Sequence, residues 1–470
     1  MNILIINVSL RPVSPVKLFP VGLGYIATAI KNAGFSFDLL DIDGHRLSER
    51  DVENSIKKKK YDVVCMGCIV TGYKIIKALA ALIEKHQPHA KIIVGNSVAT
   101  SIVDTLLTRT MVNIAVMGEG DETIVDLLRA IDEGRALETV QGICFPKNGT
   151  IVRTPARPNI KNISDMPLLD FSIFDVGLYI ENSKTSVKDP LPIAREEIRA
   201  LPVNTARGCI SKCTFCYHNF YGSPYRPRTP KSIVDEIKHS IEKYRVNYIF
   251  FWDELTFYSK EHALEMAQEI VDKNLHFYWT ANCRANLFTS DEDMKIIYKM
   301  KEAGCLGMSY SLESADREIL KAMCKYITPE QFSRQTSLFH KAGLPVWTSL
   351  VFGYPEETPL TIKETFDCCI KNRIYPSAGY LLPQPGSPMY AYAIQHGFIK
   401  DEEEYLMQLG DRQDLRLNMT KMSDKEFEFN VLEGLKRCNE ILDMGIKQEN
   451  LVKTQYYRSP KNMQDSEGSI

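Results

Sequence analysis

The sequence predicts an α/β protein with two parallel sheets in separate domains and a helical C-terminal region. Short apolar runs alternate with segments of helical periodicity in the first 150 residues, and the same alternation returns from about residue 200. A proline-rich stretch between the two series is typical of a linker. At 470 residues, the chain is long enough for two or three domains. We predict a first α/β domain at 1–140, a connector at 141–195, a second α/β domain at 196–390, a helical region at 391–458 and a disordered tail at 459–470.

The composition argues against several classes of protein. Lys and Arg number 57 against 59 Asp and Glu, a net charge of -2, so we expect no nucleic-acid partner. The apolar segment 1–8 has no cationic flank or cleavage site and is not a signal peptide, and we expect no membrane segment because no apolar run is long enough. Most of the twelve cysteines lie singly in apolar runs, as buried thiols do in a reducing compartment. We therefore expect a cytoplasmic protein.

The first domain is predicted to be a flavodoxin-like or Rossmann-like unit of five strands with helices between them. Residues 3–6 form an uninterrupted apolar run, as expected of a strand that helices cover on both faces. A helix follows Gly22 and ends near Gly34. The other predicted strands are 38–42, 63–66, 92–94 and 114–117.

The loops after these strands are rich in small and polar residues. They contain Ser9, Thr71, Gly95, Asn96, Ser97, Gly118 and Glu119. Ligands of open α/β sheets bind at this edge. A tight turn explains any single loop equally well, but four such loops together favour a bound cofactor, held by backbone N–H groups at helix N-termini. No G-x-G-x-x-G motif follows the first strand, which argues against a nicotinamide cofactor.

The second domain contains six apolar runs that are predicted to be strands. They are residues 203–206, 248–252, 277–281, 307–312, 346–352 and 378–382. Six βα repeats predict a partial (β/α)6 barrel, whose chemistry belongs at the carboxyl ends of the strands. The helical region after residue 391 is expected to cover a barrel edge or the mouth of the active site. We expect the connector and this helical region to line a substrate pocket.

Three cysteines follow the first of these strands at a C-x3-C-x2-C spacing. They are Cys209, Cys213 and Cys216. Three thiolates on an eight-residue loop can hold three irons of a 4Fe-4S cluster and leave the fourth iron open to a small molecule. The alternatives are a zinc site, for which His218 is a nearby fourth ligand, and three unpaired core thiols.

Charged side chains follow the next strands of the predicted barrel. Asp253 and Glu254 come after the second strand, Arg284 after the third and Glu313 after the fourth. Carboxylates and an arginine at one edge can bind a zwitterion, with an acid on its ammonium and the guanidinium on its carboxylate. For Glu313, capping of the next helix is the alternative.

The cysteine loop, followed by Tyr217, resembles the cluster-binding motif of radical S-adenosylmethionine (SAM) enzymes. The first domain resembles the cobalamin-binding domain of cobalamin-dependent radical SAM proteins. The stretches that support this class are 21–25, 115–123, 312–320, 352–358 and 383–388, and the resemblance covers roughly residues 1 to 425.

The resemblance assigns roles to residues. It implies that the three cysteines bind a 4Fe-4S cluster. The SAM-binding residues would be Phe215, Tyr217, Glu254, Arg284, Ser311, Glu313 and Tyr354. The cobalamin-binding residues would be Ser9, Gly22, Thr71, Gly95, Asn96, Ser97, Gly118 and Glu119.

The sequence departs from related patterns in two places. Cobalamin domains of the methionine-synthase type carry an Asp-x-His-x-x-Gly motif, which is absent here, and His45 has the wrong spacing to replace it. Where relatives often have Gly-Gly-x-His, this chain has the segment 95–98, Gly-Asn-Ser-Val. Cobalt would therefore have no lower protein ligand.

The resemblance implies a radical SAM C-methyltransferase that acts on an unactivated carbon of a small-molecule metabolite. The cluster would reduce SAM to methionine and a 5'-deoxyadenosyl radical, and cobalamin would carry the methyl group. An external one-electron donor such as flavodoxin or ferredoxin is implied. The alternatives are a cobalamin-dependent cyclase or rearrangement enzyme and a sensor of cobalamin or cluster without turnover.

Overall fold

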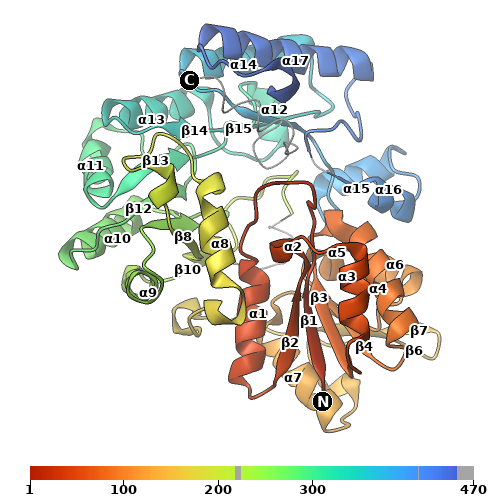
Figure 1. Ribbon diagram of the computed structural model, residues 1–470. Coiled ribbons are helices and arrows are strands. Elements are labelled where there is room, and N and C mark those ends of the chain that lie inside the picture. Colours follow the sequence, from red (N-terminus) through yellow and green to blue (C-terminus); the bar gives the residue numbers. More distant parts are fainter. Residues whose placement is uncertain (218–223, 411, 453–470) are drawn as a thin grey trace.

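The computed structural model describes residues 1–217, 224–410 and 412–452. The described chain forms two α/β units, one in the N-terminal third and one in the middle, with C-terminal helices that contact both (Figure 1). No helix among the described residues is long and apolar enough to cross a membrane. The predicted tail at 459–470 lies outside the described residues, as does His218.

The first sheet has seven strands in the order β2-β1-β3-β4-β5-β6-β7. Its parallel strands are β1 (Ile3–Asn7), β2 (Phe37–Asp41), β3 (Val63–Gly67), β4 (Lys91–Gly95) and β5 (Ile114–Val116). Their order is that of flavodoxin-like sheets, so this prediction is confirmed. The antiparallel hairpin of β6 (Ile143–Lys147) and β7 (Thr150–Arg153) joins the edge at β5, so the sheet extends past the predicted boundary at residue 140.

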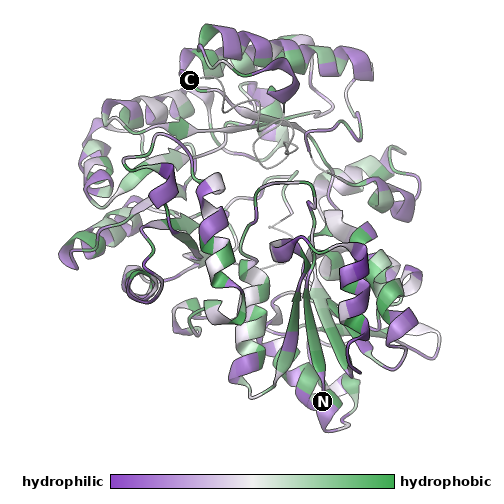
Figure 2. Ribbon diagram, viewed as in Figure 1, coloured by the Kyte–Doolittle hydropathy of each residue, from purple (hydrophilic) through white to green (hydrophobic). Residues whose placement is uncertain are grey.

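Helices cover both faces of this sheet. Ile3 and Ile5 point to the face that is packed by α1 (Val21–Asn32) and α7 (Gly120–Asp132). Leu4 and Ile6 point to the opposite face. The helices on that side are α3 (Glu49–Lys57), α4 (Tyr73–His86), α5 (Ser97–Ser101) and α6 (Val103–Arg109), and the short α2 (Ile42–His45) follows β2. Burial on both faces explains the unbroken apolar strands, which are green in Figure 2.

The second unit has six parallel strand positions, as predicted. They are β8 (Ala200–Val203), β11 (Tyr248–Phe251), β12 (Tyr278–Asn282), β13 (Cys305–Ser309), β14 (Val346–Trp347) with β15 (Ser349–Phe352), and β16 (Ser377–Tyr380). The fifth strand is interrupted at Thr348, whose hydroxyl accepts the Leu312 N–H at 3.0 Å. The intervening helices are α9 (Pro230–Tyr244), α10 (Lys260–Asp272), α11 (Met294–Glu302), α12 (Arg317–Ala322), α13 (Pro329–Lys341) and α14 (Pro359–Lys371).

The first strand of this unit corrects one prediction. The strand predicted at 203–206 ends at Val203, and the chain then turns into the separate short strand β9 (Ala206–Arg207). β9 pairs antiparallel with β10 (Arg226–Pro227). The cysteines therefore lie in the loop of a small hairpin and do not follow the barrel strand directly.

The connector and the C-terminal region complete the fold. The connector contains α8 (Val176–Ser183), and the C-terminal helices are α15 (Pro388–Gln395), α16 (Glu402–Gln408) and α17 (Asp424–Ile441). α17 packs along α14 at the top of Figure 1. α16 packs on α4 of the first unit, where the Tyr73 hydroxyl donates to Glu403 at 2.9 Å. The C-terminal helices thus contact both units.

Candidate active site

Acidic residues of the first unit hold both strands of the hairpin that carries the cysteine loop. Arg207 of β9 donates two hydrogen bonds to Asp121, at 2.9 and 3.0 Å, and Arg226 of β10 pairs with Glu119. Both acids stand at the start of α7. Burial acts to lower the pKa of Arg207, but the Asp121 carboxylate outweighs it and holds that pKa above its usual value. The sequence signal for this contact is the acidic stretch 115–123, whose pairing partners we did not predict.

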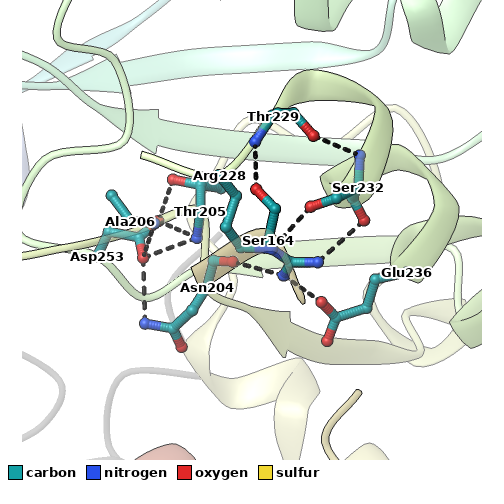
Figure 3. A network of polar contacts seen from close by, with 9 residues as sticks. All are labelled: Ser164, Asn204, Thr205, Ala206, Arg228, Thr229, Ser232, Glu236 and Asp253. Carbon is teal, nitrogen blue, oxygen red and sulfur yellow. Dashed lines mark hydrogen bonds and ion pairs between the residues drawn. The ribbon is translucent and has the colours of Figure 1, made fainter. Parts of the chain in front are cut away.

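Buried polar groups fix the turn that leads into this hairpin (Figure 3). Asp253, at the end of β11, accepts the Thr205 N–H at 2.9 Å. Arg228 pairs with the buried Glu236 and donates to the Asn204 carbonyl at 2.9 Å. Burial raises the pKa of Asp253 to about 7, although hydrogen bonds from Thr205 act to lower it. Asp253 and the pair of Arg228 and Glu236 therefore hold the base of the cysteine loop from two sides.

Thr214, between the second and third cysteines, anchors the loop itself. Its N–H donates to the Met323 carbonyl at 2.9 Å, and its hydroxyl donates to the Ala322 carbonyl at 2.9 Å. The Tyr354 hydroxyl lies 2.7 Å from the Thr214 hydroxyl oxygen. Tyr354 is only 1% exposed and does not line the cavity beside the cysteines, so it supports the loop from behind instead of lying along a ligand as expected.

The cysteine loop and the ends of the strands around it line a cavity of about 720 Å³. Most residues predicted to bind the cluster or SAM line this cavity: Cys209, Cys213, Cys216, Phe215, Glu254, Arg284, Ser311 and Glu313. Tyr217 is buried and does not line it. Burial raises the pKa of the Cys213 thiol, against the nearby Lys325, which lowers it. The structure thus brings the predicted loop and three predicted strand ends to one site.

Glu313 is held in a strained position within the cavity wall. Its backbone has a φ of 65°, in the left-handed region, and its side chain is 4% exposed. One carboxylate oxygen accepts a hydrogen bond from Lys325 at 3.1 Å, and the other has no partner among the described residues. The cap of α12 is Asp316, which accepts the Ile319 N–H at 2.8 Å, so the capping alternative for Glu313 is wrong.

Arg284 also lines the cavity of the cysteine loop, but its guanidinium already donates hydrogen bonds within the protein. Its guanidinium donates to the carbonyls of Lys325 and Tyr326, at 3.3 and 3.1 Å. Arg284 therefore helps to hold the segment that carries Lys325. Burial acts to lower the pKa of Lys325, but Glu313 raises it above its usual value.

A second cavity, of about 410 Å³, opens at the carboxyl edge of the first sheet. The predicted cobalamin-binding residues that line it are Gly22, Gly95, Asn96, Gly118 and Glu119. A Cβ added at Gly22 or Gly118 would meet nothing within 4 Å, so the glycines leave open space there. The carboxylate of Glu119, however, is engaged with Arg226 and accepts the Ile160 N–H at 3.0 Å.

The other residues predicted for this cavity do not line it. Ser9 donates to Asp43 at 2.7 Å, and the buried Ser97 accepts the Val70 N–H at 2.8 Å. Thr71 lies in the 3-10 turn Val70–Gly72. These three residues stand near the same sheet edge, but outside the cavity wall. His45, which we did not predict as a ligand, is exposed at the end of the short α2.

The donor groups suit an iron-sulfur cluster. In a 4Fe-4S cluster each thiolate binds its own iron, so three thiols on one loop can hold three of the four irons. His218, the fourth ligand of the zinc alternative, lies outside the described residues. The unpartnered Glu313 oxygen suits a ligand with a hydroxyl or ammonium group. The glycine-lined cavity suits a large, flat cofactor.

Comparisons with known families agree with this geometry. Residues 203–369 match the radical SAM superfamily, and residues 10–128 match the B12 binding domain. The chain is a B12-binding radical SAM protein.

Relatives of this radical SAM protein include enzymes of two kinds. An uncharacterized methyltransferase of Pyrococcus horikoshii is 26% identical over 385 residues, which are 81% of this chain and 79% of that protein. An anaerobic magnesium-protoporphyrin IX monomethyl ester cyclase of Rubrivivax gelatinosus is 28% identical over 356 residues, which are 74% of this chain but only 61% of the cyclase.

A solved structure shares the fold. The radical SAM methyltransferase TsrM of Kitasatospora setae, with cobalamin and a 4Fe-4S cluster bound, superposes with a TM-score of 0.65 at 20% identity. The match covers 85% of this chain and 79% of TsrM.

Proposed function

We propose that this protein is a cobalamin-dependent radical SAM C-methyltransferase that methylates an unactivated carbon of a small molecule. The observation that carries the proposal is the position of two neighbouring residues at the end of β11. Trp252 lines the cavity of the B12-binding domain, and Asp253 lines the cavity of the cysteine loop. The two proposed cofactor sites therefore share a wall, as transfer of a group between them requires.

The residues at each site suit distinct tasks. Cys209, Cys213 and Cys216 would hold the cluster, and the free oxygen of Glu313 would accept a hydrogen bond from SAM. Backbone N–H groups and open glycines would hold cobalamin at the edge of the first sheet. When bound, the cluster supplies the electron that cleaves SAM to methionine and a 5'-deoxyadenosyl radical, and cobalamin supplies the methyl group. Residues after α17, among them Ile446, Asn450 and Leu451, line the cavity of the cysteine loop and would help to shield its reaction from water.

Methylation is favoured over the alternative reactions by the relatives. The proteins from Pyrococcus and Kitasatospora are named as methyltransferases and span most of this chain. The cyclase is an example of the alternative reaction, ring formation, and this chain spans less than two thirds of that protein. A sensor without turnover is disfavoured because Glu313 and Ser311 remain at the cavity wall.

Further parts of the proposal concern the surroundings of the enzyme. A flavodoxin or ferredoxin would deliver the electron. A reducing cytoplasm is the proposed location, supported by the twelve cysteines, none of which forms a disulfide in the described part of the chain. The second unit would be a partial (β/α)6 barrel, with the domain boundaries as predicted except that the β6–β7 hairpin is assigned to the first domain.

The test is anaerobic turnover with SAM that carries a deuterated methyl group. The reconstituted protein, with cluster and hydroxocobalamin, is incubated with a reductant and cell extract as the source of substrate. We expect both 5'-deoxyadenosine and S-adenosylhomocysteine, together with a product that carries the label. The Cys213→Ala variant should form no 5'-deoxyadenosine. Release of 5'-deoxyadenosine without S-adenosylhomocysteine would point to the cyclase reaction and exclude methylation.

A further inference from the structure

A lysine from the connector reaches the cavity of the cysteine loop. The Lys188 ammonium donates to the Ser309 hydroxyl at 3.0 Å and lies 4.6 Å from the centre of the Trp347 ring. All three residues line the cavity. Lys188 precedes the residues 203–369 that match the radical SAM superfamily, so the match assigns it no role.

The connector packs on the face of the second sheet that is opposite to its helices. Val187 and Ile198 are buried against Ala200 and Tyr248, which alternate along their strands with residues that face the outer helices. This packing brings the yellow connector of Figure 1 to β13, where Lys188 meets Ser309. The buried Val187 therefore anchors the backbone next to Lys188, whereas Asp189 on the other side is exposed and paired with Arg195.

The Trp347 ring beside Lys188 is equally fixed. A Cβ at Gly307 would lie 2.5 Å from the indole, so only glycine on β13 leaves room for this ring. An indole face next to an ammonium offers an apolar surface and a charge at one place. The indole and the ammonium both come from segments outside the cysteine loop.

The charge of Lys188 has no counter-charge in the described part of the chain. The carboxylates that line the cavity are Asp253, Glu254 and Glu313, and no ion pair joins them to Lys188. Asp253 and Glu313 are hydrogen-bonded to Thr205 and Lys325. Burial lowers the pKa of Lys188 to about 8, which shows that the fold disfavours its charged form. An anion at this position would reverse that penalty.

We propose that Lys188 and Ser309, beside the Trp347 ring, form a subsite that binds a carboxylate or phosphate group of the substrate. The inference rests on the proposed function and adds the substrate class, an anionic molecule with an apolar or aromatic part. Arg412, whose guanidinium donates to the Ser377 hydroxyl at 3.1 Å, is a second cation on the same cavity wall.

Binding of simple anions tests the subsite without turnover. Benzoate, phenyl phosphate and the uncharged benzamide are titrated by calorimetry into the full chain with cluster and cobalamin, in the presence of SAM. We expect benzoate and phenyl phosphate to bind about tenfold or more tightly than benzamide, because a hydrogen bond to a charged group is worth about 1.5–3 kcal/mol. Lys188→Met should remove that preference and leave benzamide unchanged.

Control variants separate charge from folding. Lys184→Met removes a lysine of the same connector that pairs with Glu181 at 2.6 Å, and it should bind all three probes as the wild type does. Lys188→Arg keeps the charge and should keep the preference for anions. Circular dichroism of each variant confirms that it is folded.

Two outcomes would overturn the proposal. If the wild type binds benzoate and phenyl phosphate no better than benzamide, the subsite does not select anions. If Lys188→Met instead weakens SAM itself, measured by equilibrium dialysis, the anion is the SAM carboxylate and not the substrate. If methyl transfer fails but the anions still bind, only the proposed function is refuted, because the anion titration requires no reaction.

Discussion

Thr214 shows how one side chain positions a cofactor loop that it does not ligate. Its backbone and hydroxyl tie the loop to the end of α12, and the hydroxyl also meets Tyr354. These contacts hold the loop in place before a cluster arrives, so less conformational entropy is lost on binding. The cysteine spacing alone does not reveal this anchor, since its partners lie more than 100 residues away.

Thr214→Val should lower the iron content after anaerobic reconstitution several-fold. The substitution keeps the shape but leaves the Ala322 carbonyl and the Tyr354 hydroxyl without this partner, at a cost of about 1–3 kcal/mol. Thr214→Ser keeps the hydroxyl and should load iron normally. Iron analysis and the visible absorbance of the cluster give the measurement, and full loading of the valine variant would contradict the anchoring role.

Lys188→Met should be more stable than the wild type near pH 7, because it removes a partly buried ammonium without a counter-charge among the described residues. The pKa of about 8 in the folded protein lies below the value of about 10.4 in the unfolded chain. Between these values the unfolded chain binds more protons, so the free energy of unfolding of the wild type rises with pH. The difference between the two proteins should therefore shrink from pH 8 to about pH 10 in urea unfolding. A difference that does not change with pH would argue against a depressed pKa.

At the scale of elements, close helix packing holds the C-terminal region on the second unit. Gly434 of α17 lies against Phe366 of α14, and a Cβ at residue 434 would stand 2.0 Å from the phenyl ring. Both Gly434 and Phe366 are buried. The two helices approach this closely because residue 434 has no side chain.

Gly434→Ala should lower the free energy of unfolding. Alanine gains about 1 kcal/mol of helix propensity over glycine, but overpacking against Phe366 costs about 1–3 kcal/mol, so the clash should win. Gly177→Ala, on the exposed side of α8, meets nothing closer than Asp175 at 3.5 Å and should stabilise the protein. Thermal unfolding of both variants checks the opposite signs. Equal stabilisation of both would show that α17 moves away from α14 at little cost.

At the scale of the whole molecule, the two units meet at the hairpin that carries the cysteine loop. Asp121 and Glu119 of the B12-binding domain pair with Arg207 and Arg226 on the two sides of the loop. The ring of Tyr25 lies 5.6 Å from the Arg207 guanidinium and adds a second contact from the same domain. The proposed cluster site is therefore built partly by the domain that would bind cobalamin.

Asp121→Asn should reduce cluster retention as well as stability. It leaves the half-buried Arg207 without its full counter-charge, which costs about 1–3 kcal/mol. Glu122→Gln removes the same charge from an exposed position on the same turn and should change neither property. The measurement is the rate of iron loss to a chelator together with the melting temperature. Normal iron retention in the asparagine variant would show that the hairpin does not depend on this contact.

The sequence predicts those features that depend on neighbouring residues. The apolar run at 3–6 and the cysteine spacing depend on local pattern, and the strands and the loop follow from it. The sequence does not predict the turn between β8 and β9, because this turn depends on a hydrogen bond from Thr205 to Asp253, which is 48 residues away in the chain. Ser97 does not line the cavity of the first domain, because its hydroxyl accepts the Val70 N–H of a neighbouring loop, a contact that the local sequence does not reveal. Lys188 gave no signal, since the proline-rich sequence of the connector does not reveal that it packs on the second sheet.

The hairpin also implies an order of assembly during synthesis. The carboxylates of α7 precede the cysteine loop in the chain and leave the ribosome before it, and domains generally fold in the order of their synthesis. The arginines beside the cysteine loop emerge later and find their partners already in place. We expect that the first domain acts as a template on which the loop takes its final shape, so that iron and sulfur are inserted only after that domain has folded.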